Sequence, residues 1–389
     1  MPLAEWPETL TFRQIPVGPS RHLVRFLVAD DQVIALKEEP VHVATAEFDV
    51  LRRLEAEALP AVTAIGLSSW PGRDDAILAT EYLEFSIQYR RLLARFPLGP
   101  GPYRDRLLDA MASLLVDLHR AGVYWGDCSL ANTLFRRDGD KIQAYLVDAE
   151  TSEIHPSLSD GQRAYDLDIL VENVGFGLAD LGAMQGRADA FEDAVEAAES
   201  VRQSYRALWS ELHDVRELSP GDRQAIRSRI RRLNHLGFAV DEISLSPTES
   251  GEAVDLRVAV ASRRFHAREL ARRTGIVALE GQARLLLNDL REYHAWLEAE
   301  RGAPVDPSDA ADRWLEEVFE PVVAVLRPVI GPGRDPIQAY CDVLEEKWLL
   351  SEAKGRDVGL EAALDAYLSL GAPAPEDSLV ALDIDWSGG

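Results

Sequence analysis

Cysteine is nearly absent from this chain of 389 residues. The two that occur, Cys128 and Cys341, are too few for a disulfide framework and lack the spacing of metal ligands. No run of about 18 apolar residues is present, and the N-terminal residues have neither a basic flank nor an apolar signal core. We therefore expect a cytoplasmic protein in which Cys128 is a small packed residue rather than a redox switch.

Positive charge is also in short supply. Lysine and arginine total 41 against 66 aspartates and glutamates, which gives a formal net charge of −25. A surface of this sign argues against a general nucleic-acid binder. The hydrophobic fraction of 47% is ordinary for a soluble globular protein, and the length exceeds what one core usually supports, so we expect two domains.

Lysine itself occurs only four times, and one of the four ends an apolar strand. The run Gln32-Val-Ile-Ala-Leu-Lys37 predicts that strand. Residues 46–54 then place apolar side chains at helical spacing, so Glu47 lies on a first helical turn that could face Lys37. We predict Glu47 as the ion-pair partner of Lys37, with Glu55 as the alternative. A lone lysine at a strand end would otherwise simply be solvated.

Three metal-capable polar side chains lie at the ends of other apolar strands. Asp127 and Asn132 are five residues apart, and Asp148 follows a later apolar run. An Asp-Gly turn between them predicts a hairpin of strands around residues 133–136 and 142–147, which returns Asp148 to the side of Asn132. In phosphotransfer sites one Asp takes the proton of the attacking hydroxyl, while an Asn and a second Asp hold Mg²⁺.

The order of these motifs resembles the protein-kinase-like superfamily and, in detail, its bacterial branch of lipopolysaccharide (Kdo-type) kinases and aminoglycoside phosphotransferases. The resemblance covers roughly residues 10 to 210. It implies an α+β, bilobal kinase-like domain that uses ATP and Mg²⁺ to phosphorylate a hydroxyl. The short segment after Asp148 leaves no room for a peptide-docking platform, so the expected acceptor is a small molecule, a lipid-linked sugar or a nucleic-acid end.

The resemblance implies a role for each site residue. Asp127 accepts the proton of the acceptor, Lys37 holds the nucleotide phosphates, and Glu47 orients Lys37. The expected metal ligands are Asn132 and Asp148, with Glu150 as a candidate extra ligand.

Nucleotide binding is expected to involve further residues. The predicted cofactor-binding set consists of Lys37, Ser20, Arg21, Glu81 and Leu83. The loop that covers phosphates in kinases lacks most of its glycines here, and Ser20, Arg21 and His22 could contact phosphate through their side chains instead. Glu81 and Leu83 stand where a kinase hinge receives adenine on its backbone.

Departures from the family pattern support an alternative. Trp125 takes the place of the histidine in the His-Gly-Asp motif that the catalytic loop of the family usually has. The phosphate-covering loop has one glycine, Gly18. A pseudokinase would bind nucleotide, or merely keep the fold, while a second domain engages a partner. A third hypothesis transfers AMP instead of phosphate. Asp166, near the start of a predicted helix from Tyr165, is either a carboxylate that complements the helix dipole or a substrate-binding group.

Basic residues gather between Arg216 and Arg273. A short basic helix follows Asp222, a hairpin of residues 239–245 and 253–261 comes next, and a second arginine-rich helix ends at Arg273. This Arg223–Arg273 surface could hold a phosphate-bearing ligand or an acidic partner. The alternative is a solvated arginine-rich face.

The predicted borders are a kinase-like domain over 10–212, with lobes of 10–83 and 84–212, and a smaller, mostly helical α/β domain over 219–371. Residues 372–389 form an acidic tail that we expect to be disordered. In the second domain Asp289 is expected on a helix surface, and His266 and His294 lack metal-like spacing. This domain resembles an uncharacterised bacterial domain, which implies no function.

Overall fold

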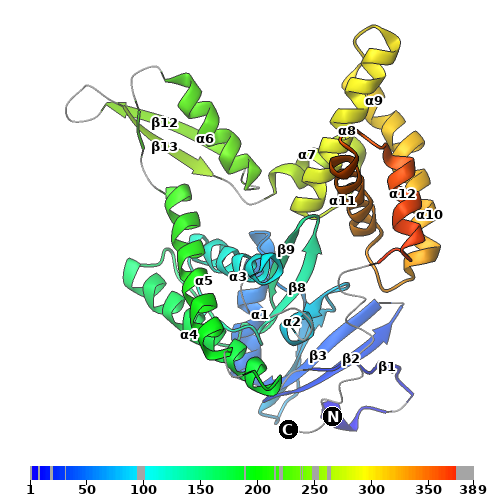
Figure 1. Cartoon of the computed structure of the whole chain (residues 1–389). Coiled ribbons are helices and arrows are strands. Elements are labelled where there is room, and N and C mark those ends of the chain that lie inside the picture. Colours follow the sequence, from blue (N-terminus) through cyan, green and yellow to red (C-terminus); the bar gives the residue numbers. More distant parts are fainter. Residues whose placement is uncertain are drawn as a thin grey trace. The chain divides into compact units, whose positions relative to one another are not determined.

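The structure is a computed structural model (Figure 1) that describes part of the chain. The described residues are 2–7, 9–17, 21–30, 32–93, 101–187, 190–213, 216–218, 222–236, 238, 240–247, 254–260 and 264–373. Ser20 and the predicted tail beyond residue 373 lie outside them. Helices and antiparallel sheets make up the fold, which confirms the predicted α+β class.

The chain divides into two compact units. The first contains Met1–Arg136 and Gln143–Leu208, and the second contains Arg137–Ile142 and Trp209–Gly389. A short segment near the middle of the sequence therefore belongs to the C-terminal unit. Among the described helices, none combines the length and apolar character needed to cross a membrane.

The first unit begins with a five-stranded antiparallel sheet in the order β1-β2-β3-β5-β4. Its strands are β1 (Phe12–Arg13), β2 (Leu23–Ala29), β3 (Gln32–Pro40), β4 (Ala64–Ser69) and β5 (Asp75–Glu81). Ile34 and Leu36 of β3 pack in one apolar cluster with Leu3 and Ile77. Side chains alternate along a strand, so Lys37 and Glu39 point to the opposite face.

Helix α1 (Val41–Ala56) follows β3 directly, because Pro40 ends the strand and precedes the first helical turn. The rest of the first unit is mostly helical. Its elements are β6 (Ile87–Gln88), α2 (Tyr89–Leu93), α3 (Pro102–Arg120), β7 (Val123–Tyr124), β10 (Glu153–Ile154), α4 (Asp160–Met184) and α5 (Ala190–His213). Strands β8 (Thr133–Asp138) and β9 (Lys141–Leu146) form the predicted hairpin, and β6 pairs with β8.

The start of α4 corrects one expectation. The helix begins at Asp160, several residues before Tyr165, because Ser159 and Gln162 form a capping box. The Gln162 amide donates to Ser159 Oγ at 3.3 Å, and the Ser159 amide donates to the Gln162 side chain at 3.0 Å. These reciprocal bonds satisfy amides that the first turn leaves open.

The second unit contains a three-stranded sheet, order β11-β13-β12, and a helical core. Its elements are β11 (Arg216–Leu218), α6 (Arg223–His235), β12 (Val240–Pro247), β13 (Val254–Val260), α7 (Phe265–Thr274), α8 (Glu280–Arg301), α9 (Pro307–Trp314), a π-helical turn (Leu315–Phe319), α10 (Glu320–Ile330), α11 (Pro336–Lys354) and α12 (Leu360–Ser369). The expectation that Asp289 lies on a helix surface is wrong. Asp289 is buried and accepts hydrogen bonds from Trp314 Nε1 at 2.8 Å and the Tyr340 hydroxyl at 2.6 Å, since buried aromatic donors need partners.

The tip of the β8–β9 hairpin is held within the second unit by polar contacts. Gln338 bonds both backbone groups of Gly139, accepting from its amide at 2.8 Å and donating to its carbonyl at 3.0 Å. Asp138 Oδ1 accepts from the Gln282 amide of α8 at 2.8 Å. Gly139 has φ +64°, and a Cβ there would lie 2.9 Å from the backbone of Gly281. Glycine is therefore needed at this turn for two reasons: its φ is positive, and the backbone of Gly281 leaves no room for a side chain.

Asp138 also makes the second unit sensitive to pH. Burial raises the pKa of Asp138 to about 6, although hydrogen bonds from the Gly281 and Gln282 amides oppose the change. A carboxyl group whose pKa is raised by folding binds its proton more tightly in the folded state. Its contribution to stability is therefore present at low pH and is lost as pH rises from the unfolded pKa toward about 6.

We predict that the Asp138→Asn variant lacks this pH dependence. Between pH 5 and 7.5 the wild type should lose roughly 1 kcal/mol of unfolding free energy relative to the variant. Urea denaturation at several pH values, followed by tryptophan fluorescence, measures the difference. Asp140→Asn, which alters the partly exposed neighbour that pairs with Arg284, is the control. Parallel curves for the wild type and Asp138→Asn would contradict the prediction.

Candidate functional site

The Lys37 ammonium group is the centre of the candidate site. Its Nζ lies 2.8 Å from Glu47 Oε2, 2.9 Å from Glu39 Oε2, 3.2 Å from Asp148 Oδ1 and 3.7 Å from Glu150 Oε2. We call these five residues the Lys37 cluster. The alternative partner, Glu55, pairs with Arg52 on the exposed side of α1. Between the two candidates, the structure therefore pairs Lys37 with Glu47.

Three elements bring the cluster together. Lys37 and Glu39 share a face of β3, and Glu47 is one of the residues that α1 buries. Asp148 and Glu150 follow β9 directly. Glu47 joins the parts, because its second oxygen accepts from the Ala149 amide at 3.0 Å. The buried Glu47 side chain thus holds both Lys37 and the segment that carries Asp148 in place.

Burial and charge move the pKa values of this cluster. Burial lowers the pKa of Lys37, but attraction to Glu47, Asp148 and Glu39 outweighs burial and raises it. Burial raises the pKa of Glu47 to about 8 in spite of attraction to Lys37, and burial also raises the pKa of Glu39. The pKa values of the lysine and of the two glutamates can all be raised, because one ammonium group is attracted to several carboxylates that repel one another. Lys37 therefore stays charged, while its single positive charge does not balance the negative charge of its partners.

Asp127 and Asn132 are adjacent in the loop before β8. The Asn132 amide nitrogen donates to Asp127 Oδ2 at 3.1 Å and to the Asp127 carbonyl at 3.2 Å. At the base of the hairpin, the Val147 amide donates to the Asn132 carbonyl at 3.1 Å. This bond places Asp148, the next residue, beside the Asn132 strand. The hairpin joins the Asp127–Asn132 pair to the Lys37 cluster.

Asp166 anchors the loop that contains Asp127, a role that was not predicted from the sequence. Its carboxylate accepts from the amides of Trp125 and Gly126 at 2.8 Å each and from Cys128 Sγ at 3.1 Å. His119 Nε2 lies 2.9 Å from the same carboxylate. Asp166 is fully buried, so neither the helix-dipole role nor substrate contact describes it. The nearest signal in the sequence was the Arg163-x-x-Asp166 pattern. The groups that donate hydrogen bonds to Asp166, however, lie about forty residues earlier in the chain.

Buried groups around Asp166 support the same role. Burial would raise the pKa of Asp166, yet hydrogen bonds from His119 and the two amides lower it. Trp125 is fully buried, and its carbonyl accepts from Thr151 Oγ1 at 2.9 Å. Cys128 is buried as well, and burial raises its thiol pKa, which fits the packed cysteine expected from the sequence.

The predicted nucleotide residues outside the cluster have local contacts. The Glu81 amide donates to the Thr63 carbonyl at 2.9 Å. The Leu83 carbonyl accepts from Ser86 Oγ at 2.6 Å. Arg21 lies in the bend before β2, and Ser20 is outside the described residues. Their roles in nucleotide binding remain predictions.

The arginine-rich segments differ in their pairing. Arg272 and Arg273 of α7 both pair with Glu269, and Arg232 of α6 lies 3.4 Å from Glu211. Those ion pairs are what the alternative, a solvated arginine-rich face, predicts. Arg227 and Arg231 are exposed on α6 and, with Gln224 and Ile230, line an open hollow of about 630 Å³. The described lining residues all belong to this one helix.

Comparison with known proteins identifies both parts of the chain. Residues 33–184 match the lipopolysaccharide kinase (Kdo/WaaP) family. This segment is a Kdo/WaaP family domain. Residues 207–370 match a domain of unknown function, DUF4032. The resemblance expected from the motifs is thereby confirmed for both regions.

Individual relatives of the Kdo/WaaP domain are distant. The lipopolysaccharide core heptose(I) kinase WaaP of Pseudomonas aeruginosa is 26% identical over 140 residues, which cover 34% of this chain and 52% of that protein. The match thus spans about half the length of this curated relative. A structure of WaaP in complex with acyl carrier protein aligns with 59% of this chain and 90% of that chain at 20% identity and a TM-score of 0.34, too low to support an argument.

We predict that Asp166→Asn destabilises the Kdo/WaaP family domain. The amide would turn a donor toward groups that already donate, at a cost of about 1–3 kcal/mol, so the thermal midpoint should fall by roughly 3–10 °C. Asp168→Asn is the control, because Asp168 is 54% exposed and only pairs with Arg202. Scanning calorimetry compares both variants with the wild type. Equal midpoints for the two variants would refute the anchoring role.

Proposed function

We propose that the Kdo/WaaP domain is a phosphotransferase that moves the γ-phosphoryl group of ATP to a hydroxyl with the help of Mg²⁺. The observation that carries this proposal is the Lys37–Glu47 pair joined to Asp148, with Nζ distances of 2.8 and 3.2 Å. Kinase-like catalysis needs a lysine for the phosphates and an acidic metal ligand in this relation. Loss of either group would remove most transition-state stabilisation.

The donor set suits a hard cation. Asn132 and Asp148 offer an amide oxygen and a carboxylate, the ligands that Mg²⁺ accepts in proteins beside water and phosphate oxygens. Glu150 remains a candidate extra ligand. The ion, when bound, would neutralise charge on the transferring phosphoryl group. Asp127, tied to Asn132, would orient the acceptor hydroxyl and take its proton.

Lys37 and the backbone would hold the nucleotide. Lys37 would exchange part of its carboxylate contacts for phosphate oxygens, while Glu47 keeps its position. The backbone of Glu81 and Leu83 would receive the adenine, and Arg21 and Ser20 would reach phosphate.

A sugar hydroxyl is the acceptor that we propose. The relative WaaP is named as a heptose kinase, and a lipid-linked sugar or another small molecule matches the short connection between Asp148 and α4. The exposed pair Arg227 and Arg231 stays a candidate site for an anionic ligand or an acidic partner. The cytoplasmic location also stays a prediction.

A pseudokinase is the second candidate function. The observation in its favour is the crowding of Lys37 by four carboxylates, which would repel nucleotide phosphates unless cations intervene. In that case the Kdo/WaaP domain would bind nucleotide without turnover.

Labelled ATP separates the proposed activities. Phosphotransfer releases ADP, AMP transfer leaves a labelled adduct, and a pseudokinase gives no turnover. We predict that Mg²⁺ with millimolar ATP raises the thermal midpoint, because a ligand that binds only the folded state stabilises it. Asp148→Asn should lose most of the Mg²⁺-dependent part of this increase.

Asp127→Asn is the matched variant for chemistry. It should retain the ATP-induced midpoint increase but reduce ADP release at least a hundredfold, since general-base catalysis contributes about that much or more. Glu55→Gln, on the exposed side of α1, is the control and should behave as wild type. Absence of any midpoint increase with Mg²⁺ or Mn²⁺ would overturn the nucleotide site, and unchanged ADP release in Asp127→Asn would overturn the catalytic assignment.

A further inference from the structure

We propose that Glu150, instead of completing the Asn132–Asp148 set, joins His22 and Glu39 in a second cation site that takes a transition-metal ion such as Mn²⁺ or Zn²⁺. The inference goes beyond the proposed function. It concerns binding by the folded chain and does not require that phosphotransfer occur.

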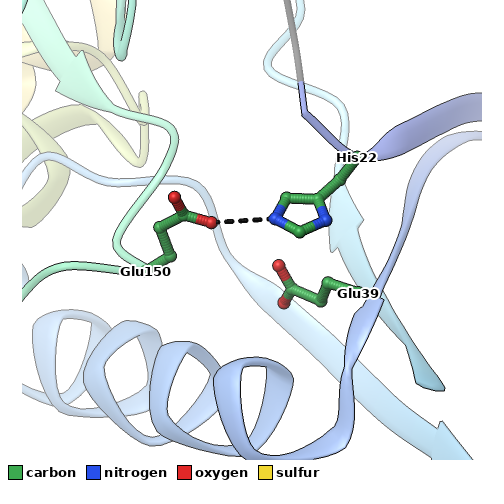
Figure 2. A group of neighbouring side chains, drawn as sticks. All are labelled: His22, Glu39 and Glu150. Carbon is green, nitrogen blue, oxygen red and sulfur yellow. Dashed lines mark hydrogen bonds and ion pairs between the residues drawn. The ribbon is translucent and has the colours of Figure 1, made fainter. Parts of the chain in front are cut away.

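The three side chains converge from separate parts of the first unit. His22 lies in the bend before β2, Glu39 near the end of β3 and Glu150 after β9. One potential ligand atom from each lies within 4.8 Å of the other two, and His22 Nε2 is 3.1 Å from Glu150 Oε2. Figure 2 shows the imidazole ring and both carboxylates turned toward a common space.

Glu39 provides an independent reason to expect a ligand. The residue is 1% exposed, and neither carboxylate oxygen accepts a hydrogen bond. Oε2 forms an ion pair with Lys37 at 2.9 Å, and Oε1 has no hydrogen-bond donor beside it among the described residues. A buried carboxylate in this state is costly, and a bound cation would satisfy it.

The charge of the Lys37 cluster points the same way. With all five groups ionised, four carboxylates and one ammonium group give the cluster a formal charge of −4 + 1 = −3. A divalent ion beside Glu39 and Glu150 would reduce it to −1. The ion would also compete with Lys37 for these two carboxylates and so free the ammonium group for other anions.

The donor types indicate which ion would bind. An imidazole nitrogen with two carboxylates favours Mn²⁺ or Zn²⁺, whereas Mg²⁺ prefers oxygen ligands alone. Ligands bonded to one ion at about 2.1 Å stand at most about 4 Å apart. The three side chains therefore need to close by less than about 1 Å. Three protein ligands would leave positions for water or an anionic ligand.

Nitrogen coordination gives a direct test. Metal-free full-length protein is titrated with Mn²⁺ without nucleotide, and pulsed electron paramagnetic resonance measures the ¹⁴N coupling of a bound imidazole. We expect wild type to bind Mn²⁺ with this coupling. His22→Gln should lose the coupling and bind at least tenfold more weakly, and Glu39→Gln should also bind at least tenfold more weakly.

His42→Gln is the matched control, because His42 is exposed on α1; it should keep both the coupling and the affinity. Circular dichroism checks that each variant is folded. The proposal is overturned if wild type binds no Mn²⁺ at millimolar concentration, if bound Mn²⁺ shows no ¹⁴N coupling, or if the coupling persists in His22→Gln. Manganese bound by Asn132 and Asp148 gives no such coupling, so failure here leaves the proposed phosphotransferase intact.

Discussion

The arrangement of the Kdo/WaaP family domain depends on one ammonium group among four carboxylates. Lys37 is the only cation within ion-pair distance of Glu39 among the ion pairs of the described residues, and it also contacts Glu47, Asp148 and Glu150. These residues come from β3, α1 and the segment after β9. Without the lysine, two buried carboxylates would lose their main compensation, which is far more costly than loss of a surface pair. The same unequal charge makes the site receptive to cations.

The β8–β9 hairpin contributes to the candidate site at its base and to the core of the second unit at its tip. Its base carries Asn132 and leads to Asp148, while its tip is enclosed by Gln282 and Gln338 of the second unit. The DUF4032 region is therefore built around a segment that the Kdo/WaaP family match also contains. A buried aspartate and a glycine with positive φ are needed at the tip, so its sequence is constrained by packing in the second unit rather than by catalysis.

Local patterns made the Lys37–Glu47 pair and the hairpin predictable. Strand alternation, helical spacing and the Asp-Gly turn act over a few residues, so they can be read without knowledge of the fold. Asp166 and Asp289 could not be read in this way. Each looks like an ordinary helical carboxylate, and its buried donors come from elements that lie 25 to 51 residues away in the sequence. The burial of Glu39 was equally hidden, because it depends on how elements distant in the sequence pack together.

A crystal structure with a non-hydrolysable ATP analogue and Mg²⁺ tests the central claim most directly. The account predicts phosphate oxygens within hydrogen-bond distance of Lys37 Nζ. It also predicts a metal ion about 2.1 Å from oxygens of Asn132 and Asp148, with Glu47 still bonded to the Ala149 amide. A nucleotide bound elsewhere, with Lys37 still held only by its carboxylates, would contradict the account.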